Sequence, residues 1–321
     1  MGSWFESMAE DDFARARTRE LLSRISRLLD PERERLLPLE EVIAILKPSS
    51  ETYVGMEAVP VDRIVGSEGR YRDFNRHFLP RREFLRTRWV RVDMAHYQDV
   101  TLPPIRLYEI GGLYFVRDGN HRVSVAKIKG QGMIDAEVTR LGAELALRPG
   151  MTLAELKREV ISYEKKAFYE KTGYGAITGD QDLDFSSPGR YDTILEHILV
   201  HKYFVNQGVK GEISFDEALW SWHENVYGPV ALAIREEGLL SRFPDRTSAD
   251  LYVFIVQHWD ELKRKYGLGF PLGEAARDYG ERFGSTPLSR LGIAARELAA
   301  RAWKRAIGAP IAKKKVKGDD R

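Results

Sequence analysis

Residues 117–124, RDGNHRVS, combine the side chains of this chain that are best suited to holding phosphate. They follow the apolar run LYFV, so a glycine, an imidazole and a guanidinium lie where a strand is expected to end. Gly119 has no Cβ to keep a phosphate away from the backbone, and Arg122 can donate two parallel hydrogen bonds to phosphate oxygens. The segment therefore predicts an anion site.

Two local structures fit this segment. Asp-Gly between an apolar strand and the alternating residues 123–128 is a strong signal for a β-hairpin. A helix over residues 120–129, ended by Gly130, fits equally well and would place Val123, Ala126 and Lys127 on one face. The choice matters because the first turn of a helix carries N–H groups without partners and a partial positive charge, which together bind anions. The local pattern does not decide between the two.

A small α+β domain is expected around this segment. Residues 59–67, 105–110, 113–116 and 133–138 have the composition and alternation of strands, with Gly111-Gly112 as a hairpin turn. A basic, aromatic stretch lies between the first two strands. Because this order is not a repeated βαβ array, the sequence favours a small mixed sheet.

Helices are expected on both sides of that domain. Residues 11–29 and 38–46 carry apolar side chains at helical spacing, and Thr152 with Glu155 is typical of a capping box that opens a helix over 153–171. Residues 173–189 read as a polar connection, and a later helix is expected over 288–307. We therefore expect an N-terminal helical segment (1–52), the α+β domain (53–145), an all-helical domain (146–308) and a basic disordered tail (309–321).

The composition narrows the class of protein. The chain has 321 residues and 31% charged side chains, which is typical of a soluble globular protein with two domains. It has no cysteine, which excludes disulfides, thiolate zinc sites and cysteine nucleophiles, and favours a cytoplasmic location. No apolar run approaches the roughly 20 residues of a membrane helix, so we expect no membrane partner. A net charge of +2 gives no general case for nucleic-acid binding.

The order of strand, Asp118-Gly119-Asn120-His121-Arg122, Val125-Ala126, Gly130 and a further strand resembles the ParB/sulfiredoxin superfamily, including its branch of free-serine kinases. The segment LPPIRL at 102–107 and the first strand, with Arg70 beyond it, are similar to the corresponding parts of that superfamily. The resemblance covers residues 55–142. It implies a ParB/sulfiredoxin-like domain that binds a nucleoside triphosphate, ATP or CTP, together with Mg²⁺.

The resemblance also implies roles for individual residues. The loop and helix start would supply phosphate donors, and a guanidinium would supply charge. The implied nucleotide-binding residues are Gly119, Asn120, His121, Arg122, Ser124 and Arg70.

Three residues are candidates for catalysis. Asp118 would hold Mg²⁺ or orient His121, although capping of the helix is an equal alternative for it. In the kinase branch an early glutamate acts as a base, and Glu57 lies at a comparable place, where a carboxylate could take the proton of an attacking hydroxyl. Glu57, Asp118 and His121 are therefore the expected catalytic set.

Departures from each branch limit the functional expectation. Sulfiredoxin-like reductases need a cysteine, and partition proteins of the ParB type usually have Glu-Arg-Arg in place of Asn120-His121-Arg122, followed by a helix-turn-helix that is not evident here. We expect a nucleotide-binding ParB-like protein that acts as a regulatory or DNA-associated module. A phosphotransferase acting on a small hydroxyl substrate and a non-catalytic structural protein are the alternatives, so enzyme activity is left open.

Other features suggest partners or packing. DNA could contact the segment 81–91, with Phe84, Trp89 and its five arginines, or the basic tail, and a homodimer is a further open alternative. His197 and His201 share a helix face, but isoleucine stands at 198 where a zinc protease motif has glutamate, which favours packing. The aromatic residues of the helical region are expected in its core: Trp220, Trp222, Tyr227, Tyr252, Phe254 and Trp259.

Overall fold

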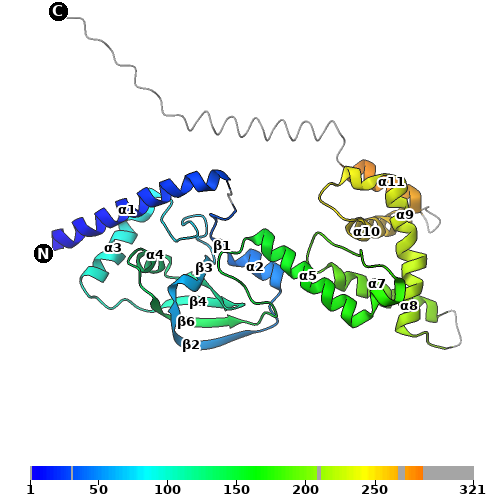
Figure 1. The fold of residues 1–321 in the computed structure, drawn as a ribbon, viewed down its shortest axis with the longest axis horizontal. Helices are drawn as coiled ribbons and strands as arrows, with labels where there is room; N and C mark the ends of the chain where they lie inside the picture. The colour runs from blue at the N-terminus through cyan, green and yellow to red at the C-terminus, as the bar shows by residue number, and fades with distance from the viewer. Residues whose placement is uncertain (1, 30–31, 208–210, 267–271, 285–321) are drawn as a thin grey trace, which may run out of the picture. The chain divides into compact units, whose positions relative to one another are not determined.

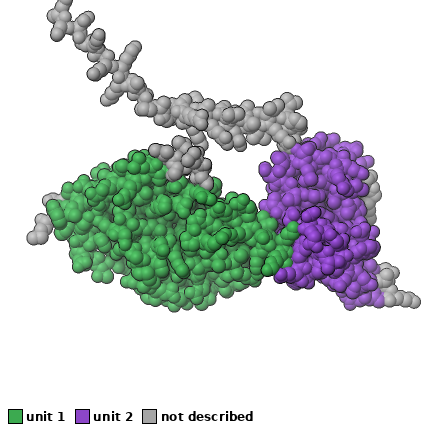
Figure 2. Space-filling view, viewed as in Figure 1, with its two compact units in different colours: residues 1–166 green, residues 167–321 purple. Residues whose placement is uncertain are grey.

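The computed structural model describes residues 2–29, 32–207, 211–266 and 272–284 (Figure 1). The chain divides into two compact units, residues 1–166 and 167–321, which Figure 2 colours separately. The first unit contains a six-stranded mixed sheet with helices, and the described part of the second is helical. The expected α+β class is confirmed.

The sheet of the first unit has the strand order β1-β3-β5-β4-β6-β2. Its strands are β1 (Leu37–Pro38), β2 (Glu51–Pro60), β3 (Ile64–Ser67), β4 (Ile105–Ile110), β5 (Leu113–Asp118) and β6 (Met133–Leu141). β4 and β5 form the expected hairpin across Gly111-Gly112, whereas β3 and β5 are adjacent and parallel. The carboxyl ends of β3 and β5 therefore open at the same edge of the sheet.

Helices cover both faces of this sheet (Figure 1). On one face, Val123 of α4 (Asn120–Ile128) packs with Phe78 and with strand residues such as Val116. On the other face, Val42 of α2 (Leu39–Leu46) and Leu156 of α5 (Leu153–Thr172) pack against β4 and β5. Two 3₁₀ turns, η1 (Val61–Arg63) and η2 (Glu83–Leu85), lie in the connections.

A further layer covers α4. The long helix α1 (Gly2–Leu29) packs on α3 (Arg86–Tyr97) and α4 through Phe13, Trp89 and Val125. The Phe13 and Trp89 rings lie 5.6 Å apart between centroids, an ordinary distance for packed aromatic rings. The N-terminal helix therefore belongs to the hydrophobic core of the first unit.

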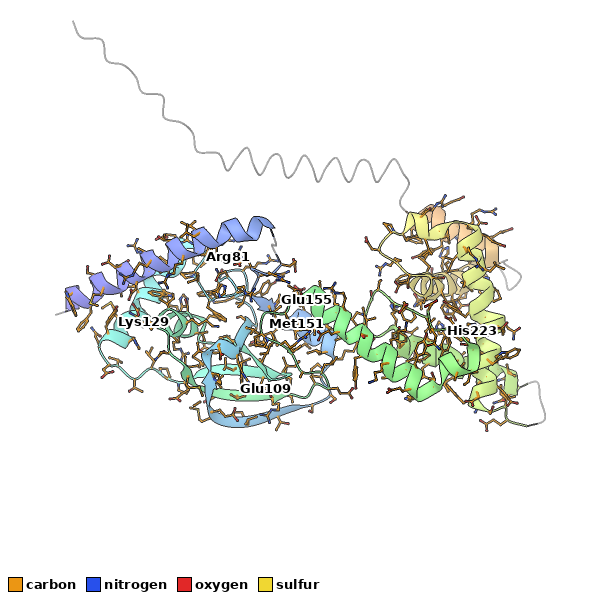
Figure 3. All side chains as sticks on the ribbon, in the orientation of Figure 1. Arg81, Glu109, Lys129, Met151, Glu155 and His223 are labelled. Atoms are coloured by element: carbon orange, nitrogen blue, oxygen red, sulfur yellow. The ribbon has the colours of Figure 1, made fainter. Side chains whose placement is uncertain are left out.

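The second unit contains α6 (Tyr174–Thr178), α7 (Arg190–Asn206), α8 (Phe215–Trp222), the π-turn η3 (His223–Tyr227), α9 (Gly228–Glu236), η4 (Leu239–Arg242), α10 (Ser248–Tyr266) and α11 (Leu272–Phe283). Trp222, Tyr227 and Tyr252 are buried, as expected, whereas Trp220 is 53% exposed. His223, labelled in Figure 3, forms a hydrogen bond with the buried Tyr174, and the distance between His223 Nδ1 and the Tyr174 hydroxyl oxygen is 2.9 Å. These aromatic and imidazole groups hold the unit together by packing and hydrogen bonds.

The two histidines of α7 also pack as expected. His197 Nδ1 lies 3.0 Å from the Tyr252 hydroxyl, and His201 Nε2 lies 3.0 Å from Ser221 Oγ. Among the residues that the structure describes, no group of three or more acidic, histidine or cysteine side chains could hold a metal ion. Within the same residues, no helix has the length and apolar character needed to cross a membrane.

Several element bounds differ from the sequence expectation. α1 begins at Gly2, because Ala9 continues the buried stripe of Phe13 and Ala16 toward the N-terminus. The single strand expected over 59–67 is wrong: Pro60 ends β2 at one edge of the sheet, and η1 leads into β3 near the opposite edge.

The expected segment bounds can be placed on the same elements. The boundary expected at 52/53 falls within β2, the boundary between the two units falls within α5, and the connection 173–189 contains α6. The helix expected over 288–307 and the tail 309–321 lie outside the described residues.

The capping box expected at the start of α5 is confirmed. The Thr152 backbone N–H donates to Glu155 Oε2 at 2.8 Å, and the Glu155 N–H donates to Thr152 Oγ1 at 3.2 Å. Met151 and Glu155, both labelled in Figure 3, lie at this helix start. Two of the helix's unpaired N-terminal donors are thereby satisfied, which fixes where α5 begins.

Candidate functional site

A cavity of about 500 Å³ opens at the edge where β3 and β5 end. It is lined by residues 67–70 after β3, by Asp73, by Arg88 and Val92 of α3, and by residues 117–122. The segment singled out by its chemistry therefore forms one wall, and α3 and the chain after β3 supply the others.

Residues 120–128 form a helix, so the hairpin alternative for this segment is wrong. Gly119 is the N-cap with φ +106°, a conformation that favours glycine strongly. A Cβ at this position would lie 2.9 Å from Ile105 Cβ and still closer to Ile105 Cγ2. Both backbone conformation and packing therefore require glycine where the strand turns into the helix.

The start of α4 presents backbone donors to the cavity. The Val123 N–H donates to the Gly119 carbonyl at 3.0 Å and begins the helical hydrogen-bond pattern. The N–H groups of residues 120–122 come before this bond, so they have no intrahelical acceptor, and all three residues line the cavity. This is the geometry in which helix starts hold phosphate or carboxylate groups.

Arginines outnumber carboxylates in the cavity wall. Three ion pairs are present: Arg70–Asp73 at 3.2 Å, Arg117–Glu68 at 4.0 Å and Arg122–Asp118 at 2.6 Å. Arg88 is the fourth arginine, and no acidic side chain of the described residues lies within 4.0 Å of it. The wall therefore carries a net positive charge with Arg88 uncompensated.

Arg122 is largely engaged in holding the loop before β4. Its Nη1 donates to the Pro103 carbonyl and to the Pro104 carbonyl at 3.0 Å, and its Nη2 donates to Asp118 Oδ2. A guanidinium has five N–H donors, so only part of this one faces the cavity free of protein partners. Arg122 therefore positions the site as well as charging it, and Asp118 is its partner rather than a helix cap, because α4 has no side-chain cap.

Asn120 and His121 carry buried polar atoms without partners. Asn120 is 7% and His121 5% exposed, and Asn120 Oδ1 and His121 Nδ1 have no hydrogen-bond partner among the described residues. A buried polar atom without a hydrogen-bond partner destabilises the folded state by about 1–3 kcal/mol. Two such atoms in neighbouring residues that line one cavity are therefore unfavourable for the protein without a ligand. Burial, and then the charges of Arg88 and Arg70, lower the pKa of His121 to about 4. The imidazole is therefore neutral at pH 7.

Ser124, one of the expected nucleotide-binding residues, does not line the cavity. It is fully buried, its hydroxyl donates to the Phe78 carbonyl at 2.6 Å, and it accepts from Trp89 Nε1 at 2.9 Å. Ser124 lies on the inner side of α4, so its hydroxyl joins α3 and the turn at Phe78 to the helix. Its role is structural.

Glu57 also lies away from the cavity. It is on β2, opposite Ala136 of β6, and β2 is separated from β5 by β6 and β4. Three inter-strand spacings amount to roughly 14 Å. Glu57 is not among the lining residues, so the structure brings Asp118 and His121 together but not Glu57.

The basic stretch expected as a DNA surface is divided between several roles. Arg81 lies 3.8 Å from Glu20, and Arg86 lies 2.6 Å from Glu10, so α1 compensates both. Trp89 is buried, whereas Phe84 is 69% exposed. Arg88 turns toward the cavity. The five arginines therefore do not form one uncompensated basic strip.

Sequence reasoning missed Arg88, Glu68 and Asp73 as members of the site. Arg88 is twenty-nine residues or more from the loop in sequence, and only the packing of α3 on α4 brings it there. Glu68 follows β3, which reaches the site through parallel pairing with β5. Neither relation leaves a local signal in the sequence.

Comparison with known proteins adds no assignment. No protein-family model matches the chain, and no curated protein or solved structure is significantly similar to it.

Proposed function

We propose that the first unit binds a nucleoside triphosphate, ATP or CTP, with its phosphates against the first turn of α4, as expected for a ParB-like domain. One observation carries this proposal: a single cavity is lined by Arg88, which has no acidic partner among the described residues, and by residues 120–122, whose N–H groups have no intrahelical acceptor. Two of these residues, Asn120 and His121, also each carry a buried polar atom without a hydrogen-bond partner. Each of these groups, taken alone, also occurs in proteins at places that bind no ligand. Their convergence on one cavity favours a polyanionic ligand.

The residues present suit the phosphate groups. Backbone N–H groups would donate to one phosphate, and Arg88 and Arg70 would neutralise it and its neighbour with charge-assisted hydrogen bonds. Asp118 is the residue that would hold Mg²⁺, through the carboxylate oxygen that Arg122 does not contact, and the ion would neutralise phosphate charge. One carboxylate is enough, because this ion keeps several waters.

The arrangement favours binding over phosphoryl transfer. The expected base, Glu57, lies three strands away, and Asp118 is paired with Arg122. We therefore propose a nucleotide-dependent regulatory module, in which nucleotide binding at α4 regulates the rest of the protein. Phosphoryl transfer to a small hydroxyl compound and DNA contact are not favoured by any contact in the site.

Thermal unfolding with ATP, CTP, their diphosphates and inorganic phosphate, with and without Mg²⁺, tests the proposal. A ligand at a hundred times its Kd stabilises the folded state by about 2.7 kcal/mol. Arg88→Gln should raise the Kd for the nucleotide about tenfold or more, because a charge-assisted hydrogen bond contributes about 1.5–3 kcal/mol to binding.

Arg91→Gln is the matched control, since Arg91 is also exposed on α3 but does not line the cavity. Equal loss in both variants, or no stabilisation of the wild-type protein by any nucleotide, would contradict the proposal. Arg88 is preferred to Arg122 for this test because removing Arg122 would also release the loop at Pro103.

A further inference from the structure

Lys127, in the last turn of α4, lines two cavities that share no residue with the candidate nucleotide site. It lies about 10 Å along the helix axis from the first turn of α4. The larger cavity has a volume of about 670 Å³ and the smaller about 260 Å³, and both are lined by Asp62, His77 and Lys127. Lys127 therefore stands where the two cavities meet.

The Lys127 ammonium has no ionic partner in the described part of the chain. Its Nζ lies 5.3 Å from the centre of the Phe78 ring, and no carboxylate of those residues comes within 4.0 Å. Lys129, two residues later and labelled in Figure 3, is instead paired with Asp12 and with Asp93, the latter at 3.2 Å. Burial lowers the pKa of Lys127 to about 8, with Asp62 opposing and Arg76 adding to the shift.

The surroundings of Lys127 are basic on one side and apolar on the other. Arg76 lines the smaller cavity, where its Nη1 donates to the Arg33 carbonyl at 3.0 Å. Burial lowers the pKa of His77, so that ring adds no positive charge at pH 7. In the larger cavity the wall includes Val61, Leu79 and Ile128. Of the residues with described positions, Asp62 is the one acidic residue that lines either cavity.

We propose that Lys127 anchors a second ligand site, which binds a small organic anion. The carboxylate or phosphate ester of this ligand would lie between Lys127 and Arg76, and its carbon body would lie against Val61, Leu79 and Ile128. A mixed cavity with a few fixed charges is the usual form of a small-molecule site, and a half-buried ammonium without an ionic partner is stabilised by an anion. The inference does not depend on the nucleotide proposal, because the two sites share no lining residue.

Protection of Lys127 from acylation tests this site in the wild-type protein. The folded chain is treated at pH 8 with N-hydroxysulfosuccinimide acetate, and acetylation of Lys127, Lys129 and Lys157 is followed by peptide mass spectrometry. Succinate and glycerol 3-phosphate serve as the probes for the two anion types. We expect at least one probe to slow acetylation of Lys127 fivefold or more and to leave the exposed Lys157 unchanged. Equal rates at Lys127 with and without both probes would overturn the proposal.

Variants separate this site from the nucleotide site. Lys127→Met keeps the aliphatic stem without the charge, and it should weaken binding of the protecting probe at least tenfold in calorimetry, whereas Lys157→Met should bind as the wild type does. Arg88→Gln should also bind the probe normally. Normal binding by Lys127→Met, or loss of probe binding in Arg88→Gln, would overturn the proposal, the latter because it would assign the anion to the nucleotide site. The acylation experiment needs no variant and decides the question if Lys127→Met does not fold.

Discussion

Replacing Gly119 by alanine should destabilise the first unit and disrupt the start of α4. At φ +106° an L-residue is strained by about 1–3 kcal/mol. The added methyl group would lie 2.9 Å from Ile105 Cβ, and overpacking of this kind costs about a further 1–3 kcal/mol. We therefore expect a loss of about 3–4 kcal/mol in the free energy of unfolding, measured by urea denaturation.

Gly130→Ala is the matched control at the other end of the same helix. Gly130 has φ +70°, and nothing lies within 4 Å of the position its Cβ would take. Only the backbone strain applies, so the expected loss is about 1 kcal/mol. The difference of about 2–3 kcal/mol combines the close approach of β4 to the strand-to-helix turn with the greater backbone strain at φ +106°. Equal losses in the two variants would refute this account of the packing. Unchanged nucleotide stabilisation in Gly119→Ala would refute the placement of phosphate at the helix start.

Two further predictions concern neighbouring positions on α4. Ser124→Ala should lower the free energy of unfolding, measured by urea denaturation, by about 2–4 kcal/mol, because the buried Trp89 Nε1–H and Phe78 carbonyl both lose their partner. The affinity for nucleotide should stay unchanged. A variant with normal stability and lost nucleotide affinity would show that Ser124 contacts the ligand. The His121 ring should titrate near pH 4 in NMR spectra, assigned with His121→Gln. Because its folded pKa lies below the unfolded value of about 6.5, the folded state binds fewer protons, so His121 costs stability as pH falls from about 6.5 toward 4. Bound phosphate should raise the pKa of His121. A titration midpoint near pH 6.5 in the absence of ligand would contradict the burial of His121 and the electrostatic effect of Arg88 on it.

The turn at Gly119 shows what the sequence could and could not decide. Asp-Gly after an apolar strand fits a hairpin and a helix start equally, because both conformations place glycine at positive φ. The outcome depends on long-range pairing. β5 already has β3 and β4 as its two neighbours, so residues 123–128 have no free edge of β5 to pair with, and they pack as a helix on the sheet face. No local pattern contains that information.

Residue types in the loop were informative, but their orientation was not. Asn120 and His121 line the cavity, whereas Ser124, three residues after His121, does not and is fully buried beneath α3. A helix face could be assigned in advance only if the position of α3 were known. The same limit applies to Glu57. It lies within β2 rather than before the first strand, and the strand order that separates β2 from β5 could not be predicted from the sequence.

The N-terminal helix illustrates how packing determines the geometry of the site. Treated as a separate segment, α1 would have no bearing on the cavity. In the structure, Phe13 packs on Trp89, and the pairs that Lys129 makes with Asp12 and Asp93 connect α1, α3 and α4. Because Arg88 precedes Trp89 on α3, the contact that buries Trp89 against α1 also fixes the helix face on which Arg88 reaches the cavity. The position of the uncompensated charge in the site therefore depends on residues more than seventy positions earlier in the chain.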